Sequence, residues 1–252
     1  MLHFELDKIK LPKYFKQCKE KNDIIKFVYS NKFSDLTDDD FGNRAIVTPL
    51  NENVTKLNDY IIDNYIHSKK REYFGTDKED TYEKGHKDLL LPLEVLHNMN
   101  PSGFPKYKLV LKKGAIVICL RNLEFGLANG TKLKVKEMYE HNLVLKILTG
   151  PNKNEIVHLP RITLSQRLKS EATLLVRKQF PINLAYALTI DKSQGQSLKR
   201  VGIYLCSECF AHGQLYTALS RATNPKMLCY YIGLTGEQEC TTNVVWKEVF
   251  LC

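Results

Sequence analysis

Hydrophobic and polar positions alternate in three different ways along the chain. In its first part, a helix over 11–30 is predicted by apolar residues at helical spacing among lysines: Phe15, Cys18, Ile24, Ile25 and Val28. The apolar run at 44–49 predicts a buried strand. The apolar residues Val54, Leu57 and Ile61 predict a helix after it, with Asn51 as its cap. A strand that leads into a capped helix is typical of an α/β unit.

The pattern then changes twice. Residues 67–88 are almost wholly polar and are expected to form a long exposed loop, before a short helix over 89–99 and a turn at Asn100–Gly103. Five short β-like runs follow at 107–111, 115–120, 131–140, 143–148 and 156–159, which favour a small antiparallel barrel. After Arg177 the α/β texture returns, with strands at 200–205 and 227–233, a short helix at 213–221 and a closing helix at 241–251 that holds Trp246.

Composition indicates a globular protein with an uneven distribution of charge. Of the 252 residues, 43% are hydrophobic and 26% are charged, and the formal net charge is +9. Residues 105–180 carry 15 basic and 5 acidic side chains, a net +10, against −2 for 1–104 and +1 for 181–252. A basic segment of this kind is typical of a nucleic-acid contact surface, although a solvated lysine-rich face is an equal alternative.

The chain begins without an apolar signal region, and its seven cysteines are an odd number, so we expect reduced thiols in the nucleus or the cytosol. Cys206 and Cys209 have the spacing of half a zinc site, but a second such pair is missing. We therefore predict ordinary thiols there and no metal site.

The stretch at 181–223 carries the most informative chemistry. A polar, glycine-broken loop over Thr189–Leu198 is followed by a strand and by a short helix that ends at Arg221. A loop that presents backbone N–H groups and a helix that delivers a guanidinium are suited to binding polyphosphate. Within this helix, Tyr216 is expected in the core.

These residues also resemble a known family. Gln179-Phe180-Pro181, Thr189, Lys192–Ser197 and His212–Arg221 are similar to the last two motifs of superfamily-one DNA helicases of the petite-integration-frequency family, in its Helitron-transposon and large-virus branch. Further similar stretches begin at Arg44, Asn100 and Leu159. The resemblance implies an α/β fold: a RecA-like second motor domain (1–104 and 177–252) interrupted by a small Src-homology-like antiparallel β-barrel (105–176).

The resemblance also implies roles for single residues. Arg221 would be an arginine finger that reaches the γ-phosphate of ATP, where the alternative is an arginine that complements its helix dipole. Gln194, Gly195 and Gln214 would bind nucleotide. Single-stranded DNA would contact Thr48, Asn51, Thr189, Lys192 and Ser193, and Asn51 has the alternative role of helix cap. From the charge distribution, four lysines that bracket the first barrel strand are added to the DNA contacts: Lys106, Lys108, Lys112 and Lys113.

Two departures from the family limit what this chain does by itself. It contains no Gly-Lys and no Asp-Glu dipeptide, so the phosphate-binding loop and the carboxylate pair that hold ATP and Mg²⁺ are missing. Asp191 stands where the family has His or Asn, and its charge would repel a DNA phosphate. Two hypotheses follow: half of an ATP-dependent 5′-to-3′ DNA helicase, which binds ATP and Mg²⁺ only with a partner chain that carries the first motor domain, or a stand-alone module that binds single-stranded nucleic acid without catalysis.

Overall fold

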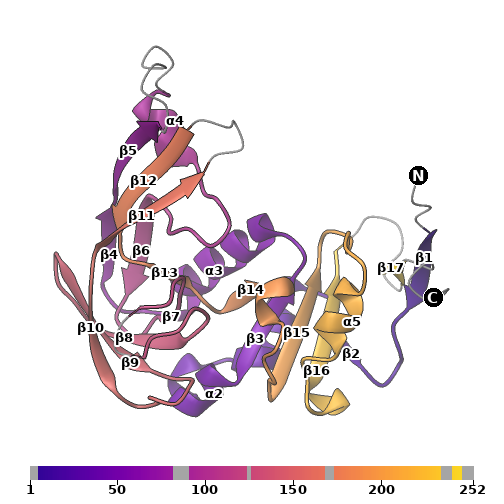
Figure 1. Ribbon diagram of the computed structural model, residues 1–252. Coiled ribbons are helices and arrows are strands. Elements are labelled where there is room, and N and C mark those ends of the chain that lie inside the picture. Colours follow the sequence, from indigo (N-terminus) through magenta and orange to yellow (C-terminus); the bar gives the residue numbers. More distant parts are fainter. Residues whose placement is uncertain (1–4, 82–90, 124–125, 168–172, 234–239, 246–252) are drawn as a thin grey trace. The chain divides into compact units, whose positions relative to one another are not determined.

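A computed structural model describes residues 5–81, 91–123, 126–167, 173–233 and 240–245 (Figure 1). The chain divides into two compact units. Unit 1 comprises 1–65 and 185–252, and unit 2 comprises 66–184. The division therefore falls at 65/66 and 184/185, and the domain boundaries at 104/105 and 176/177 stay a prediction from the sequence. None of the described helices has the length and the apolar character that crossing a membrane requires.

Unit 1 is an α/β unit. Its strands are β1 (Glu5–Lys10), β2 (Lys16–Gln17), β3 (Arg44–Thr48), β14 (Ala187–Thr189), β15 (Arg200–Leu205), β16 (Leu228–Ile232) and β17 (Cys240–Val245). Its helices are α1 (Lys21–Tyr29), α2 (Asp38–Gly42), α3 (Asn51–Tyr65) and α5 (Gln214–Leu219), with short 3₁₀ turns η1 (Phe33–Asp35), η3 (Asp191–Ser193) and η4 (Pro225–Met227).

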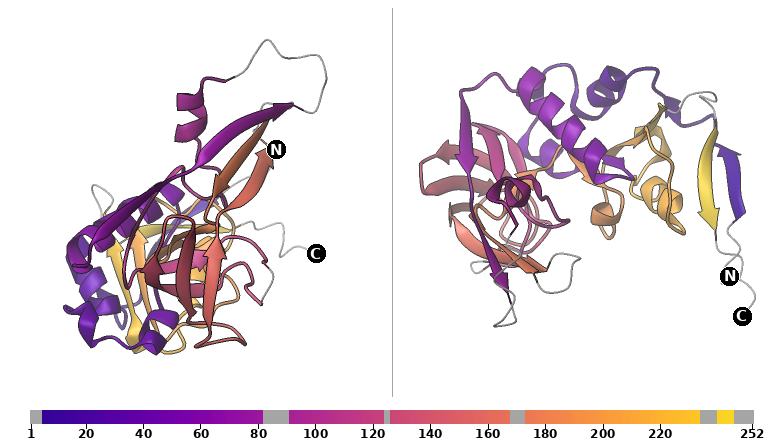
Figure 2. Two further views of the ribbon diagram at one scale, coloured as in Figure 1. Left: turned by 90° about the vertical axis from the view of Figure 1, so that its left-hand side faces the viewer. Right: turned by 90° about the horizontal axis from the view of Figure 1, so that it is seen from above.

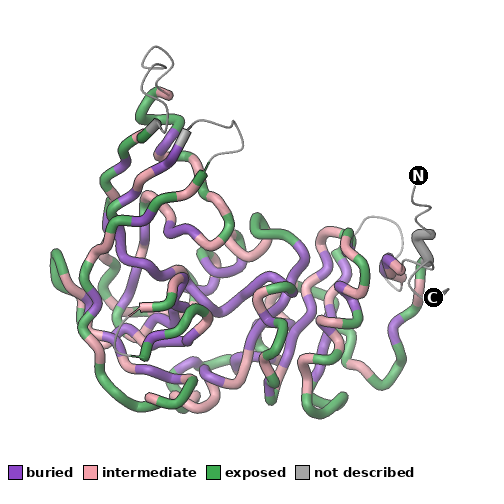
Figure 3. Tube along the Cα trace, in the orientation of Figure 1, coloured by how far each residue is buried: buried purple, intermediate pink, exposed green. Residues whose placement is uncertain are grey.

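A parallel five-stranded sheet in the order β14-β3-β15-β16-β2 forms the centre of unit 1 (Figure 1). The register pairs Arg44 with Arg200 and Thr48 with Thr189. The two segments that meet in this sheet are separated in sequence by the whole of unit 2, and the prediction that 44–49 and 200–205 share one sheet is confirmed. Both strands are largely buried (Figure 3).

Helices α1 and α3 pack on this sheet through their apolar sides. Ile24 and Val28 of α1 lie against Gly202 of β15, where an added Cβ would come within 2.6 Å of the Ile24 side chain. Glycine at this position therefore allows the helix to approach the strand closely. From α3, the buried Asn58 donates to the Ala187 carbonyl and accepts from the backbone N–H groups of Tyr186 and Ala187. Its side chain thus fixes the edge strand β14 to the helix.

Three predictions in unit 1 need correction. The helix expected over 11–30 begins only at Lys21, because Lys16–Gln17 pairs with β16 as an edge strand. Asn51 lies inside α3 as its first residue and does not precede the helix as a cap. The expected closing helix is a strand over 240–245 that pairs with β1, and the rest of that helix, with Trp246, falls outside the described residues.

Unit 2 is mainly antiparallel. Its described strands are β4 (Lys70–Phe74), β5 (Thr76–Thr81), β6 (Lys108–Lys112), β7 (Ile116–Cys119), β8 (Lys132–Met138), β9 (Asn142–Ile147), β10 (Ile156–Pro160), β11 (Ile162–Arg167), β12 (Thr173–Gln179) and β13 (Ile182–Leu184), and helix α4 spans Leu93–Asn98. They form a five-stranded sheet β10-β9-β8-β7-β13, a three-stranded sheet β11-β12-β5 and a ribbon β4-β6, which Figure 2 shows from two further sides.

The five β-like runs, the short helix and the turn at Asn100–Gly103 are confirmed at or near their predicted positions. The first run, however, pairs with β4 in the ribbon and lies outside the five-stranded sheet. The loop expected over 67–88 is wrong over 70–81, where β4 and β5 form, and 82–88 lie outside the described residues.

Candidate nucleotide and nucleic-acid sites

The two predicted ends of the 181–223 stretch come together in unit 1. The loop at 190–198 follows β14, and Gly195 in it has a φ of +78°, a left-handed conformation that favours glycine. Helix α5 contacts η3 in this loop. The sequence therefore correctly predicted a polar loop and a short helix. Arg221, predicted at the end of that helix, lies in the turn after Leu219, and the structure places it in contact with the loop.

Arg221 makes this contact, since its half-buried guanidinium group donates to backbone carbonyls of the loop. Nη1 lies 3.2 Å from the Gln196 oxygen and 3.5 Å from the Ser193 oxygen. Arg221 follows the last residue of α5 by two positions, and its Nε donates to the Thr217 carbonyl of that helix at 2.9 Å. In this conformation the guanidinium group stabilises the loop that carries Gln194 and Gly195, which are both exposed.

Gln214 connects the other end of α5 to the same loop. Its buried side chain accepts from the Phe210 N–H at 3.1 Å and donates to Asp191 Oδ1 at 3.5 Å. Asp191, the departure from the family pattern, thus takes a hydrogen bond from a residue predicted to bind nucleotide. Tyr216 is 73% exposed, so its predicted place in the core is wrong: α5 buries Leu215 and Ala218, and Tyr216 lies on its other side.

Three of the hydroxyls predicted to contact DNA lie beneath the surface. Thr48 and Thr189 are paired neighbours at the ends of β3 and β14, and Ser193 donates to the Ile190 carbonyl at 2.6 Å. Thr48 Oγ1 has no hydrogen-bond partner among the described residues. Burial lowers the pKa of Lys192, which is half-buried. Asn51 is exposed on the first turn of α3.

The four lysines predicted at the barrel differ in their surroundings. Lys112 is buried, and its Nζ donates to the Ile66 carbonyl at 2.8 Å, so its ammonium group does not face solvent. Lys108 is exposed and pairs with Glu72 at 3.0 Å. Lys106 is half-buried, and Lys113 is exposed on the turn after β6.

Arg177 is the cation whose role the sequence did not reveal. It is fully buried in unit 2, where Nε and Nη2 donate to the two carboxylate oxygens of Asp77 at 2.7 and 2.8 Å. Its other donors reach the carbonyls of Leu96, Met99 and Pro105 at 2.8 to 3.1 Å. Every N–H of the guanidinium group is therefore used within the fold. Arg177 is one of the 15 basic residues of 105–180, but it contributes nothing to the surface of that segment.

The cysteine pair differs in exposure, since Cys209 is buried and Cys206 is half-buried. Burial raises the pKa of both thiols, and the nearby Asp191 carboxylate helps to raise that of Cys209 to about 12.

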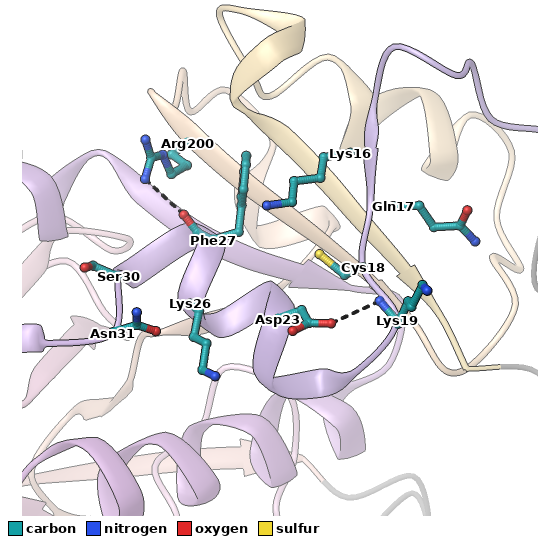
Figure 4. Close-up of a pocket in the computed structure, with 10 residues that line it drawn as sticks. All are labelled: Lys16, Gln17, Cys18, Lys19, Asp23, Lys26, Phe27, Ser30, Asn31 and Arg200. Atoms are coloured by element: carbon teal, nitrogen blue, oxygen red, sulfur yellow. Dashed lines mark hydrogen bonds between the residues drawn. The ribbon is translucent and has the colours of Figure 1, made fainter.

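A separate hollow of about 580 Å³ lies in unit 1 beside the carbonyl end of α1 (Figure 4). Lys16 and Arg200 lie on its wall, each 5.3 Å from the centre of the Phe27 ring, and Arg200 donates to the Phe27 carbonyl. Cations at the carbonyl end of a helix complement its dipole, and none of the predicted site residues lines this hollow.

A family model, curated relatives and solved structures all show similarity between this chain and the same group of helicases. Residues 94–138 match the model of the family described as DNA helicase Pif1, 2B domain. The ATP-dependent DNA helicase Pif1 of Campylobacter jejuni is 35% identical over 132 residues, which cover 49% of this chain and 29% of the relative. The human ATP-dependent DNA helicase PIF1 is 40% identical over 119 residues, which cover 45% and 18%. The chain is related to the Pif1 helicases.

Solved structures agree with this relationship. The Pif1 helicase of Candida albicans superposes with a TM-score of 0.57 at 26% identity, over 77% of this chain and 46% of that one. Bacteroides Pif1 bound to single-stranded DNA superposes with a TM-score of 0.55 over 86% and 49%, and at 21% identity it supports the α/β helicase fold alone. This Pif1 relative thus spans less than a third of those curated proteins and about half of those solved structures.

Proposed function

We propose that this chain provides the second motor domain and the accessory β domain of an ATP-dependent 5′-to-3′ DNA helicase. The observation that carries the proposal is the contact between Arg221 and the carbonyls of Ser193 and Gln196. It connects the guanidinium group that follows α5 to the loop that carries Gln194 and Gly195. We assign the motor domain to unit 1 and the small barrel to the five-stranded sheet of unit 2. The Helitron and large-virus branch remains part of this proposal.

In the transition state of phosphoryl transfer from ATP, negative charge is spread over the equatorial oxygens of the γ-phosphoryl group, where a guanidinium group would stabilise it. Arg221 would turn from the Ser193 and Gln196 carbonyls toward that group, and Gln214 and Gln194 would hold the loop in place. The residues fit half of a nucleotide site, because the chain lacks the Gly-Lys pair of a phosphate-binding loop and the Asp-Glu pair for Mg²⁺. A first motor domain, on a separate chain where this polypeptide acts alone, would supply them.

The test measures ATP hydrolysis by the 252-residue chain, alone and with a first motor domain of a Pif1 relative added. We expect no hydrolysis by the chain alone, with or without single-stranded DNA, and DNA-stimulated hydrolysis by the pair. Arg221→Ala should then lower turnover by about 10³-fold or more, the scale of an arginine finger. Hydrolysis by the purified chain alone that Arg221→Ala abolishes would contradict the account of the missing parts.

The second candidate is a module that binds single-stranded nucleic acid without catalysis. The charge of unit 2 favours it, since residues 66–184 carry 21 basic and 12 acidic side chains, a net +9, and unit 1 is neutral with 16 of each. Affinity should then fall with salt at a slope of about −0.7 per phosphate contact and be independent of ATP.

A triple variant tests the lysines of this candidate. Lys106, Lys108 and Lys113 are changed to glutamate. The buried Lys112 is left in place because its ammonium group donates to the Ile66 carbonyl. Binding should weaken for all sequences and depend less on salt, and Lys192→Ala should have a smaller effect because Asp191 lies beside it. If Lys192→Ala abolishes binding and the triple variant does not weaken it, the DNA path runs over unit 1.

A further inference from the structure

The ribbon of β4 and β6 in unit 2 has one buried face, and its other face is exposed at the end formed by Phe74 and Lys108. On the inner face, Tyr73, Leu109 and Leu111 are buried. On the outer face, the antiparallel register places Phe74 directly opposite Lys108. Phe74 is 49% exposed, a large ring left open at the end of a strand whose neighbouring residue is buried.

Phe74 contacts a neighbouring ring through its side chain and a neighbouring arginine through its backbone. The Tyr107 ring lies 6.0 Å away at 60°, and the His97 ring stacks on Tyr107 at 3.7 Å with an interplanar angle of 13°. Arg161 Nη1 donates to the Phe74 carbonyl at 2.9 Å, which fixes the backbone that carries the ring. Three rings in succession and an anchored backbone give Phe74 a rigid support, with one side of the residue open to solvent.

Positive charge lies over this ring. Lys108 Nζ is 5.7 Å from the Phe74 ring centre and 3.0 Å from Glu72 Oε2, and Lys70 takes the other Glu72 oxygen at 2.9 Å. Hydrogen bonds from Lys70 and then Lys108 lower the pKa of Glu72. Glu72 therefore offsets one of the two lysines, and the surrounding unit has a net charge of +9.

We propose that Phe74 is a stacking platform for a base of single-stranded nucleic acid, with Lys108 at the adjacent phosphate. An open aromatic face beside a cation is the combination that binds unpaired bases without regard to sequence. Single exposed apolar residues are common on protein surfaces, but this one differs through its ring support and its cation. A protein partner would also cover an exposed ring, but the charge of unit 2 favours a polyanion. The inference rests on the proposed nucleic-acid binding and specifies where the bases lie.

The experiment separates stacking on bases from attraction to phosphates. Fluorescence anisotropy measures the affinity of the whole chain for a short oligothymidine and for an abasic oligonucleotide of the same length. Because stacking on an aromatic side chain contributes about 5- to 100-fold per base, wild type should prefer the oligothymidine. Phe74→Ala and Phe74→Leu should weaken binding of the oligothymidine by about 5-fold or more and leave binding of the abasic strand unchanged, and Phe74→Trp should retain the preference.

The matched control is Tyr139→Ala, since Tyr139 belongs to the same unit and is 52% exposed but donates its hydroxyl to Glu137. This variant should bind both strands like wild type. Phe74→Leu keeps an apolar side chain, so it serves if the alanine variant folds poorly. If wild type binds neither strand, the proposed function itself fails. If wild type binds but the Phe74 variants weaken both strands equally, or neither, Phe74 does not stack on bases and a protein partner becomes the better explanation of its exposure.

Discussion

Arg177 in unit 2 and Arg221 in unit 1 both donate to backbone carbonyls, but they differ in what else they face. Arg177 is fully buried and holds both oxygens of Asp77. Arg221 is half-buried, and no carboxylate is among its hydrogen-bond partners in the described part of the chain. To move Arg177 would leave a buried carboxylate unpaired, which costs several kcal/mol. To move Arg221 would release carbonyls near solvent, which water can satisfy.

The difference separates a structural arginine from one that is able to reach a ligand. Neither the residue type nor the basic character of the segment distinguishes them, because Arg177 lies in the more basic unit. The distinguishing quantity is the cost of withdrawing the guanidinium group from its present partners. Four substitutions test this comparison, from the largest expected effect to the smallest. Two change the arginines themselves, one changes the buried Lys132, and one changes Asp191 in the loop that Arg221 contacts.

Arg177→Met should lower the free energy of unfolding of unit 2 by about 3–5 kcal/mol, because it leaves Asp77 buried without its partner. Urea unfolding followed by hydrogen exchange in peptides from 66–184 measures it. Lys178→Met is the control, since Lys178 is the exposed neighbour on the same strand and should change stability by less than about 0.5 kcal/mol. Equal effects of the two variants would show that the Arg177–Asp77 pair does not hold the unit together.

Lys132 extends the comparison to a buried lysine. Burial lowers the pKa of Lys132 from 10.5 to about 7. Between these values the unfolded chain binds more protons than the folded chain, so wild-type stability should rise with pH across this window. Lys132→Met should therefore stabilise the protein by about 2–4 kcal/mol below pH 7, and the gain should vanish toward pH 10.5. Thermal unfolding at several pH values measures it, and a gain that is independent of pH would contradict a charge effect.

The pattern of hydrophobic residues predicted the parallel sheet but missed two strands of unit 2. Strands such as 44–48 and 200–205 are continuous apolar runs because both of their faces are covered, and such runs are visible in the sequence. Residues 70–81 are rich in charge, and their strands form because they pair with β6 and β12 far along the chain. A single sequence does not show such partners, so this segment resembled a loop. The same holds for 240–245, which pairs with β1.

The candidate site was predictable in its residue types and unpredictable in its contacts. The loop with Gly195 and the short helix before Arg221 have a recognisable spacing, and both formed near their predicted positions, although the helix ends at Leu219 and leaves Arg221 in the following turn. That Gln214 bonds Asp191, or that the ammonium group of Lys112 is buried against Ile66, depends on which backbone groups the fold leaves without partners. Those groups are defined only once the chain is folded. For the same reason, the sequence does not distinguish the buried Arg177 from a cation on the surface.

Arg221→Ala should have a small and local effect on stability, in contrast to Arg177→Met. Each hydrogen bond to a carbonyl contributes about 1 kcal/mol, and the Arg221 side chain is half-exposed. Amide exchange at Gln194 and Gln196, whose N–H groups bond to Asp191 and Ser193, should become about 5- to 10-fold faster. Exchange in unit 2 should not change. Ser220→Ala is the control, because it removes a contact to Nη2 and none to the loop. A loss of stability as large as that of Arg177→Met would make Arg221 a structural residue as well.

Asp191→Asn should have the smallest effect, and it tests whether the family departure weakens DNA contact at this loop. Asparagine retains an oxygen for the hydrogen bond from Gln214 Nε2, so the loop should keep its conformation. The substitution removes one negative charge beside Lys192, whose pKa burial already lowers. We therefore expect single-stranded DNA to bind about 2- to 5-fold more tightly at low salt, with the gain lost near 1 M salt, where charges are screened within about 3 Å. Anisotropy titrations with Glu208→Gln as the matched control measure this change, since Glu208 lies in the same unit but outside the loop. If Asp191→Asn leaves affinity unchanged while the triple lysine variant weakens it, DNA contacts unit 2 alone. The loop at 190–198 would then position Arg221 and would not contact the DNA strand.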